Sequence, residues 1–240
     1  MSIPLTPRLQ KAASLVGFSP FSTAENSSRC GKGIVVCDVG CDHAYLSLTL
    51  VLSGKCEYAV ASDLREGPLV SARANVEAYG CESRITTVQT NGLQGLDVYH
   101  PTDIVICGMG GDTMMDILSR ADFIKKNGMR LILQPQSAFA ELALFLADLG
   151  FRILAERYAV ERNKAYRIIA LEYDSVSREL SLPDALIGKL SFEEDKVAYH
   201  AFCRKILHTV DKKIQGAHLS HQDPSPLTKL RESISELILL

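Results

Sequence analysis

The sequence predicts an α/β fold, with a mostly parallel sheet closed by an antiparallel hairpin and followed by a pair of helices. Three observations lead to this prediction. Apolar runs typical of buried strands alternate with helical segments between residues 33 and 150. Two strand-like runs, 151–160 and 165–173, are then separated by only four residues. Beyond residue 175 the apolar side chains recur at helical spacing.

The first observation gives the order of the elements. An amphipathic helix is expected at 5–16 and a connecting loop, rich in Ser, Gly and Asn, at 19–33. The expected strands are 33–39, 58–63, 85–89, 103–107 and 130–134, and the helices between and after them are 44–52, 68–79, 112–120 and 138–149. Strands and helices that alternate in this way form a parallel sheet with right-handed crossovers.

The second observation sets the end of the sheet. The linker Glu161-Arg162-Asn163-Lys164 is too short for a crossover helix, so the two strand-like runs form an antiparallel hairpin. Five parallel units closed by a hairpin are the plan of the Rossmann-like class I methyltransferases. Dehydrogenases usually continue with a sixth parallel strand instead.

The third observation concerns the C-terminal part of the chain. A helix is expected at 193–217 and a loop at 216–225, and a second apolar stripe runs from Leu227 to Leu237. These segments predict a helical hairpin, coiled-coil-like, packed on itself or on the preceding domain. We therefore expect two domains, residues 1–174 and residues 175–240.

Composition sets limits on the class of protein. Of the 240 residues 47% are hydrophobic and 22% charged, typical of a globular chain. The seven cysteines lack paired CxxC spacing, so reduced thiols and no metal site are expected. No secretory signal and no apolar run long enough for a bilayer is found, so we expect a cytoplasmic protein, and a monomer is favoured. The net charge of −2 neither indicates nor excludes a nucleic-acid partner.

The loop after the first strand carries the strongest signal for a ligand. It reads Asp38-Val39-Gly40-Cys41-Asp42-His43 and leads into a helix. Gly40 permits a tight turn and close approach of a ligand, and the helix N-terminus favours a carboxylate. Asp42 would repel a pyrophosphate, so a positively charged sulfonium cofactor suits the loop better than a dinucleotide. Asp38, Val39 and Gly40 are predicted to bind this cofactor; the alternative is a simple turn with Asp42 as helix cap.

The next three strands end in residues that belong to the same edge of the sheet. Asp63, followed by Leu64, ends the second strand and is placed to bind ribose hydroxyls rather than to be a plain surface acid. Asn91-Gly92 follows the third strand, either as a reader of adenine N6 or as an ordinary turn. The fourth strand ends in Gly108-Met109-Gly110-Gly111, which indicates close backbone approach to a ligand.

These motifs together resemble one family. The stretches 38–46, 66–68, 108–111 and 131–135 are similar to the successive signatures of the TrmK family, the tRNA (adenine-22-N1)-methyltransferases. Arg8-Leu9 and the hairpin residues Glu161 and Lys164-Ala165-Tyr166 fit the same pattern. Cys41 and Ser47 depart from it, since the family usually has Ser and Pro there. The resemblance covers residues 5–173 well, and the C-terminal helices match in type.

The resemblance implies that a methyl group passes from S-adenosyl-L-methionine to N1 of an adenine at position 22, in the D-arm region of tRNA. Adenine N1 has an in-plane lone pair, so no base has to remove a proton before attack. Asp42 would stabilise the cation that forms, and His43 would orient the base or accept a proton later. The backbone of Gly108 would accept hydrogen bonds from the adenine N6 group, and Met109 would lie beside the adenine.

RNA also needs cationic contacts. Arg204, His208 and Lys212 recur every four residues on the C-terminal helix, with Lys205 beside them, and predict a phosphate-tracking face rather than a merely solvated one. Lys11 and Arg8 are a second possible contact, or Arg8 holds the cofactor carboxylate. Three other functions stay open: a methyltransferase acting on another RNA, a protein or a small molecule; a non-catalytic cofactor-binding module; and a nicotinamide oxidoreductase.

Overall fold

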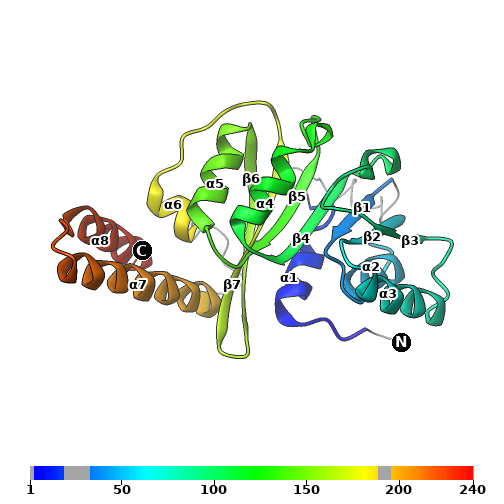
Figure 1. Ribbon diagram of the computed structural model, residues 1–240, viewed down its shortest axis with the longest axis horizontal. Coiled ribbons are helices and arrows are strands. Elements are labelled where there is room, and N and C mark those ends of the chain that lie inside the picture. Colours follow the sequence, from blue (N-terminus) through cyan, green and yellow to red (C-terminus); the bar gives the residue numbers. More distant parts are fainter. Residues whose placement is uncertain (1–2, 19–32, 189–195, 240) are drawn as a thin grey trace.

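A seven-stranded sheet with the order β3-β2-β1-β4-β5-β7-β6 forms the centre of the computed structural model, which describes residues 3–18, 33–188 and 196–239 (Figure 1). Strands β1 to β5 pair in parallel, and β7 runs antiparallel to both β5 and β6. The strands are β1 (Val35–Val39), β2 (Tyr58–Asp63), β3 (Ile85–Gln89), β4 (Asp103–Met109), β5 (Arg130–Pro135), β6 (Phe151–Glu161) and β7 (Lys164–Tyr173). The predicted fold class is confirmed.

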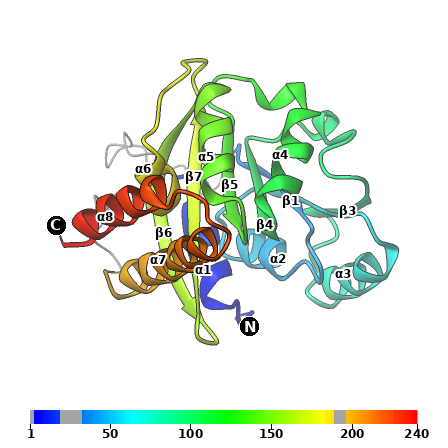
Figure 2. The ribbon, with the colours of Figure 1, turned by 60° about the vertical axis from the view of Figure 1, so that its left-hand side comes forward.

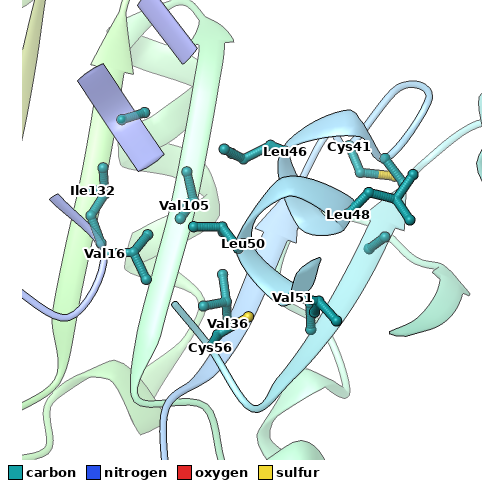
Figure 3. Close-up of a cluster of buried hydrophobic side chains, with 14 of the residues drawn as sticks. Val16, Val36, Cys41, Leu46, Leu48, Leu50, Val51, Cys56, Val105 and Ile132 are labelled. Atoms are coloured by element: carbon teal, nitrogen blue, oxygen red, sulfur yellow. The ribbon is translucent and has the colours of Figure 1, made fainter. Parts of the chain in front are cut away.

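Helices cover both faces of this sheet (Figures 1 and 2). One face carries α1 (Pro7–Leu15), α2 (Tyr45–Leu52) and α3 (Glu66–Ala78), and the other carries α4 (Gly111–Ser119) and α5 (Phe139–Asp148). Because successive strand residues point to opposite faces, Val36 and Val105 pack into the first layer while Cys37 and Ile104 pack into the second. Figure 3 shows the first layer, where Leu50 of α2 lies among the strand residues. Burial on both faces explains the continuous apolar runs of the strands.

The hairpin of β6 and β7 reaches past the carboxyl edge of the parallel strands. Pairing of β5 with β7 ends at Leu133 and Ile169, and β5 itself ends two residues later at Pro135, so residues 164–166 extend beyond the end of β5. The strands of the hairpin pair up to Glu161 and Lys164, and the two residues between them, Arg162 and Asn163, both have positive φ. This is a type I′ turn, whose twist matches that of the paired strands. The hairpin therefore forms a wall beside the edge where ligands bind.

The C-terminal helices are α6 (Leu182–Ile187), α7 (Lys196–Leu219) and α8 (Ser225–Leu239). Helix α7 packs on α8 and also on the hairpin, because Tyr158 and Ala165 share one apolar cluster with Phe202 and Ile206 of α7. The predicted helical pair therefore packs both on itself and on the sheet. The division at residue 174 remains a prediction.

A buried ion pair joins the hairpin to α6. Arg167 of β7 and Glu156 of β6 are each 2% exposed, and the Nε atom of Arg167 donates to Oε1 of Glu156 at 2.9 Å. The Nη1 atom of Arg167 donates to the carbonyl oxygen of Ala185 at 2.7 Å. The hydroxyl of Tyr158 donates to the carbonyl oxygen of Ile187, also at 2.7 Å. Removal of α6 would leave the Nη1 group of Arg167 and the hydroxyl of Tyr158 without these carbonyl acceptors.

The element boundaries between residues 5 and 173 lie within two residues of those expected. Three short elements were missed: α6 and the 3₁₀ turns η2 (Leu96–Tyr99) and η3 (Asp122–Ile124), which are too short to show an apolar period. The start of the helix expected at 193, and residues 19–32 of the expected loop, lie outside the described residues. Within the described parts of the chain, no helix combines the length and apolar character needed to cross a membrane.

The cysteines that the structure describes are free thiols, and all but Cys107 are buried. Burial raises the pKa of Cys37, Cys56 and Cys107 to about 12. These thiols therefore stay protonated and inert at neutral pH, and act as small apolar side chains in the core. Cys30 lies outside the described residues.

Candidate active site

The loops that follow β1, β2, β3 and β4 line one cavity of about 480 Å³ at the carboxyl edge of the sheet. This is the position where open parallel sheets bind ligands. The predicted site residues that line it are Val39, Gly40, Asp42, Asp63, Leu64, Asn91, Gly92, Gly108 and Met109. The structure thus brings together residues that lie up to 70 positions apart in the sequence.

Gly40 occupies the floor of this cavity. Its φ of +75° is a left-handed conformation, and a Cβ atom on it would lie 2.5 Å from the methyl carbon of Met109. Any larger residue would therefore displace Met109 from the cavity. The N–H groups of Gly40 and Cys41 donate to the carbonyl oxygen of Ser62 at 2.8 and 2.9 Å, so the loop after β1 is held against the end of β2.

Asp42 lines the exposed mouth of the cavity, and His43 lies beside Asp42. The Asp42 side chain is 72% exposed and that of His43 is 45% exposed, and the Nε2 atom of His43 lies 3.6 Å from Oδ1 of Asp42. The ring of His43 lies 5.7 Å from that of Tyr45, and His43 is not part of the cavity lining. Asp42 does not cap α2, because the N-cap residue is Ala44 and no side chain bonds to the helix there. The alternative assignment as helix cap was wrong.

Asp63 and the turn at Asn91 form the next part of the wall. The Oδ1 atom of Asp63 accepts a hydrogen bond from the N–H of Arg65 at 3.0 Å, which orients the carboxylate. Gly92 has a φ of +63°, and the carbonyl oxygen of Asn91 accepts from the N–H of Gln94 at 3.3 Å. The segment is thus a turn and also lines the cavity, so the two interpretations of Asn91-Gly92 are compatible.

Gly108 is a β-bulge at the end of β4. The register of β4 with β5 shifts between Cys107 and Met109, so Gly108 has no pairing partner in the ladder, and its φ is +84°. A bulge re-aims the strand end and frees backbone groups for other contacts. A Cβ atom on Gly108 would lie 3.4 Å from Nη1 of Arg8 and 3.6 Å from Nε2 of Gln136.

Two predicted cofactor residues do not line the cavity. Asp38 is buried beneath it and accepts a hydrogen bond from the hydroxyl of Ser47 at 2.8 Å, and burial raises its pKa to about 6. Arg8 lies beside Gly108, where its Nη1 donates to Oε1 of Gln134 at 3.1 Å and its Nε lies 3.5 Å from Oε2 of Glu161. Arg8 therefore joins α1 to β5 and to the hairpin.

Helix α4 supplies cavity residues that the sequence analysis missed. Thr113, Asp116, Ile117 and Arg120 line the cavity, and their spacing of three and four residues places them on one face of the helix. This spacing was present in the sequence, where a helix was expected at 112–120 but no site residue was assigned to it. Thr90, Arg65 and Cys107 complete the wall.

The cations predicted to contact RNA lie outside this cavity. Arg204 and Lys205 line a second hollow between α7 and the hairpin, together with Gln136 and Lys164. Lys212 is exposed farther along α7, and Lys11 is partly exposed on α1. The structure therefore separates Lys212 from the pair Arg204 and Lys205.

The lining of the cofactor cavity carries three aspartates, Asp42, Asp63 and Asp116, and two arginines, Arg65 and Arg120. A cavity with an acidic excess, a glycine floor and an acid at the end of β2 suits a cationic, ribose-bearing ligand. With a parallel sheet closed by an antiparallel hairpin, these features define a Rossmann-like class I methyltransferase.

The comparison with known families identifies the particular group. Residues 36–238 match the TrmK family, tRNA (adenine(22)-N(1))-methyltransferase, and the chain belongs to this family. The chain is 29% identical over 216 residues to the tRNA (adenine(22)-N(1))-methyltransferase of Bacillus subtilis, covering 86% of this chain and 90% of that one.

Solved structures agree with this assignment. A Streptococcus pneumoniae protein, described as a candidate tRNA (m1A22) methyltransferase and solved with S-adenosyl-L-methionine, is 31% identical. It aligns over 98% of this chain and 100% of its own, with a TM-score of 0.78. The TrmK structure from B. subtilis aligns over 98% of this chain and 99% of its own, at 25% identity and a TM-score of 0.80.

Proposed function

We propose that this protein transfers the methyl group of S-adenosyl-L-methionine to N1 of adenine 22 in the D-arm region of tRNA. The observation that supports it most is the convergence of the four strand-end loops on one acidic cavity with backbone exposed at Gly40 and Gly108. Membership of the TrmK family supports the choice of adenine N1 and tRNA.

The residues present fit the cofactor. Asp63 has its carboxylate oriented at the cavity wall for the ribose hydroxyls, and the lack of a Cβ atom at Gly40 lets Met109 stay in the cavity wall. Leu64 is exposed and lines the cavity, so it offers an apolar surface for the adenine ring. The bound cofactor supplies an activated methyl group on a sulfonium.

The protein's own contribution is positioning and electrostatics. Adenine N1 attacks with its lone pair, so a general base is not required for the transfer. Asp42 lies at the mouth, where the methylated adenine becomes cationic, and its carboxylate stabilises that charge. Since Asp42 is 72% exposed in the free protein, its full effect depends on the RNA covering the mouth and excluding water.

Gly108 and His43 position the adenine in this scheme. The unpaired backbone of the β4 bulge accepts a hydrogen bond from the adenine amino group, and the exposed ring of His43 borders the incoming base. N1 lies on the pairing edge of adenine, so the base must be unpaired or extruded to reach the cavity. Lys11, Arg204 and Lys205 supply contacts to the RNA backbone.

Incubation of the purified protein with labelled S-adenosyl-L-methionine and unmodified tRNA tests the proposal. We expect label in the tRNA, mapped to N1 of adenine 22, and no label in a matched tRNA that carries guanine at that position. Label at another nucleotide would assign a different site, and label absent from tRNA but present in protein or small molecules would replace the substrate class.

A further inference from the structure

The hollow between the hairpin and α7, here called the cationic groove, has a volume of about 590 Å³. Its lining includes the three cations Lys164, Arg204 and Lys205. All of its lining lies within the described residues and none of it is acidic. A hollow with this charge excess is matched to an anion.

Lys205 is held in a fixed position in this groove. Its Nζ atom donates to the carbonyl oxygen of Ala165 at 3.1 Å and lies 5.1 to 5.7 Å from the ring centroids of Phe139, Phe202 and Tyr166. Three aromatic rings and one carbonyl immobilise an ammonium group that would otherwise be mobile. Because its rotamer is already ordered, a ligand that binds it meets a smaller entropic cost.

The electrostatics of the groove also favour a bound anion. Burial lowers the pKa of Lys205 below its usual value, and the positive charge of Lys164 lowers it further. The positive charges of Lys164 and Lys205 repel each other in this partly desolvated hollow. A bound anion would offset this repulsion.

The groove borders the cofactor cavity at Gly108. Gln136 lines the groove, and its Nε2 lies 3.6 Å from the position of a Cβ atom on Gly108, which lines the cavity. Gln136 therefore lies between Gly108 of the cavity and the groove, whose lining continues to Lys205. An RNA strand whose base enters the cavity beside Gly108 would continue along this path.

We propose that the cationic groove binds the phosphodiester backbone of the RNA strand next to the target adenine, with Lys205 as its fixed contact and Lys164 and Arg204 at its rim. This inference rests on the proposed function and locates the RNA strand within it. Of the cations predicted to contact RNA on α7, it concerns Arg204 and Lys205; Lys212 lies outside the groove, and its contact with RNA stays a prediction.

The experiment measures tRNA affinity against salt concentration for the full-length protein, independently of methyl transfer. Lys205→Met keeps the length of the side chain but removes the charge, and Lys213→Gln, exposed on the same helix outside the groove, is the matched control. We expect Lys205→Met to weaken binding roughly fivefold to tenfold at about 0.1 M salt, and to reduce the slope of log K against log salt by about 0.7–0.9, the value of one phosphate. Lys213→Gln should leave both unchanged.

A purely structural role of Lys205 gives a different result. It would lower Tm without changing the salt slope, and that outcome overturns the proposal, as does equal behaviour of Lys205→Met and Lys213→Gln. Lys164→Gln is the second variant, since this exposed side chain can be changed without disturbing the core, and it too should reduce the slope. If wild type binds tRNA with the expected slopes but does not methylate adenine 22, the groove stands and the proposed reaction fails.

Discussion

The cofactor cavity and the cationic groove lie side by side on the same edge of the sheet but differ in charge. Three of the five charged residues that line the cavity are aspartates, whereas the three charged residues of the groove are all cations. Gln136, which is uncharged, lies where they meet. In the proposed function, the sulfonium and the phosphodiester therefore bind in neighbouring hollows of opposite charge.

This difference explains why net charge was a poor guide. A total of −2 averages an acidic hollow and a basic one, and so neither predicts nor excludes an RNA partner. What matters is which charges the topology brings together. The predictions below change one hollow at a time and measure whether the other responds.

The largest effect is expected at the mouth of the cavity. Asp42→Asn preserves size and most hydrogen bonding but removes the charge that faces the cation formed on adenine, so kcat should fall by roughly 10²-fold or more. The affinity for tRNA should hardly change, because the substitution leaves the residues of the cationic groove unchanged. Single-turnover kinetics measure this, with Asp97→Asn, exposed outside the cavity, as control. A rate within a few-fold of wild type would transfer the electrostatic role to His43 and the Gly108 loop.

A smaller effect is expected at the end of β2. Asp63→Ala should weaken cofactor binding by about 1–3 kcal/mol, since ribose hydroxyls would lose a charged partner. Titration calorimetry with S-adenosylhomocysteine measures it, and the same variant should bind tRNA as wild type does. Unchanged cofactor affinity in a folded variant would remove Asp63 from the site.

Beneath the cavity, Asp38 predicts a pH effect on stability. Its pKa is raised from 3.8 to about 6 in the folded protein, so between these values the folded state holds a proton that the unfolded state has lost. This contribution to stability is therefore complete below the unfolded-state pKa and is lost as the pH rises toward the folded-state pKa, by about 2 kcal/mol between roughly pH 4 and 6. Asp38→Asn should abolish that part of the pH dependence in urea unfolding. An unchanged profile would show that Asp38 titrates normally.

The smallest effect is expected at the rim of the groove. Arg204→Gln should weaken tRNA binding only a few-fold, because Arg204 is exposed and its contact with phosphate is screened by solvent. Cofactor affinity should stay the same. Filter binding at several salt concentrations measures the change; a loss of cofactor affinity in this variant would show that the two hollows are coupled rather than independent.

Much of the fold could be predicted because buried parallel strands and amphipathic helices leave periods that survive in a single sequence. The strand ends were then enough to assemble Gly40, Asp63, Asn91 and Gly108, since carboxyl ends of parallel strands share one edge. The face of α4 that lines the cavity was missed because the apolar period of this helix shows only which side packs on the sheet. The sequence does not show that a neighbouring side borders the cavity.

Other features depended on tertiary geometry. Asp42 was a possible cap by local pattern, but α2 begins later, at Tyr45, after Ala44 in a left-handed conformation. Arg204, His208 and Lys212 looked equivalent by helical spacing, yet of these three only Arg204 lines the hollow beside the hairpin, together with Lys205. The helix period records which residues share a side and gives no information about what lies opposite.

The buried pair of Arg167 and Glu156 has a consequence for inheritance. The guanidinium is satisfied partly by β6 and partly by the carbonyl of Ala185 in α6, so the hairpin and α6 carry complementary halves of one buried polar network. The C-terminal helices cannot be replaced during evolution without regard to the hairpin. A replacement must place a hydrogen-bond acceptor where the carbonyl of Ala185 lies, or Arg167 and Glu156 must change with it. Helix α7, which is proposed to contact RNA, thus evolves under a constraint set by two charges that are buried away from the surface.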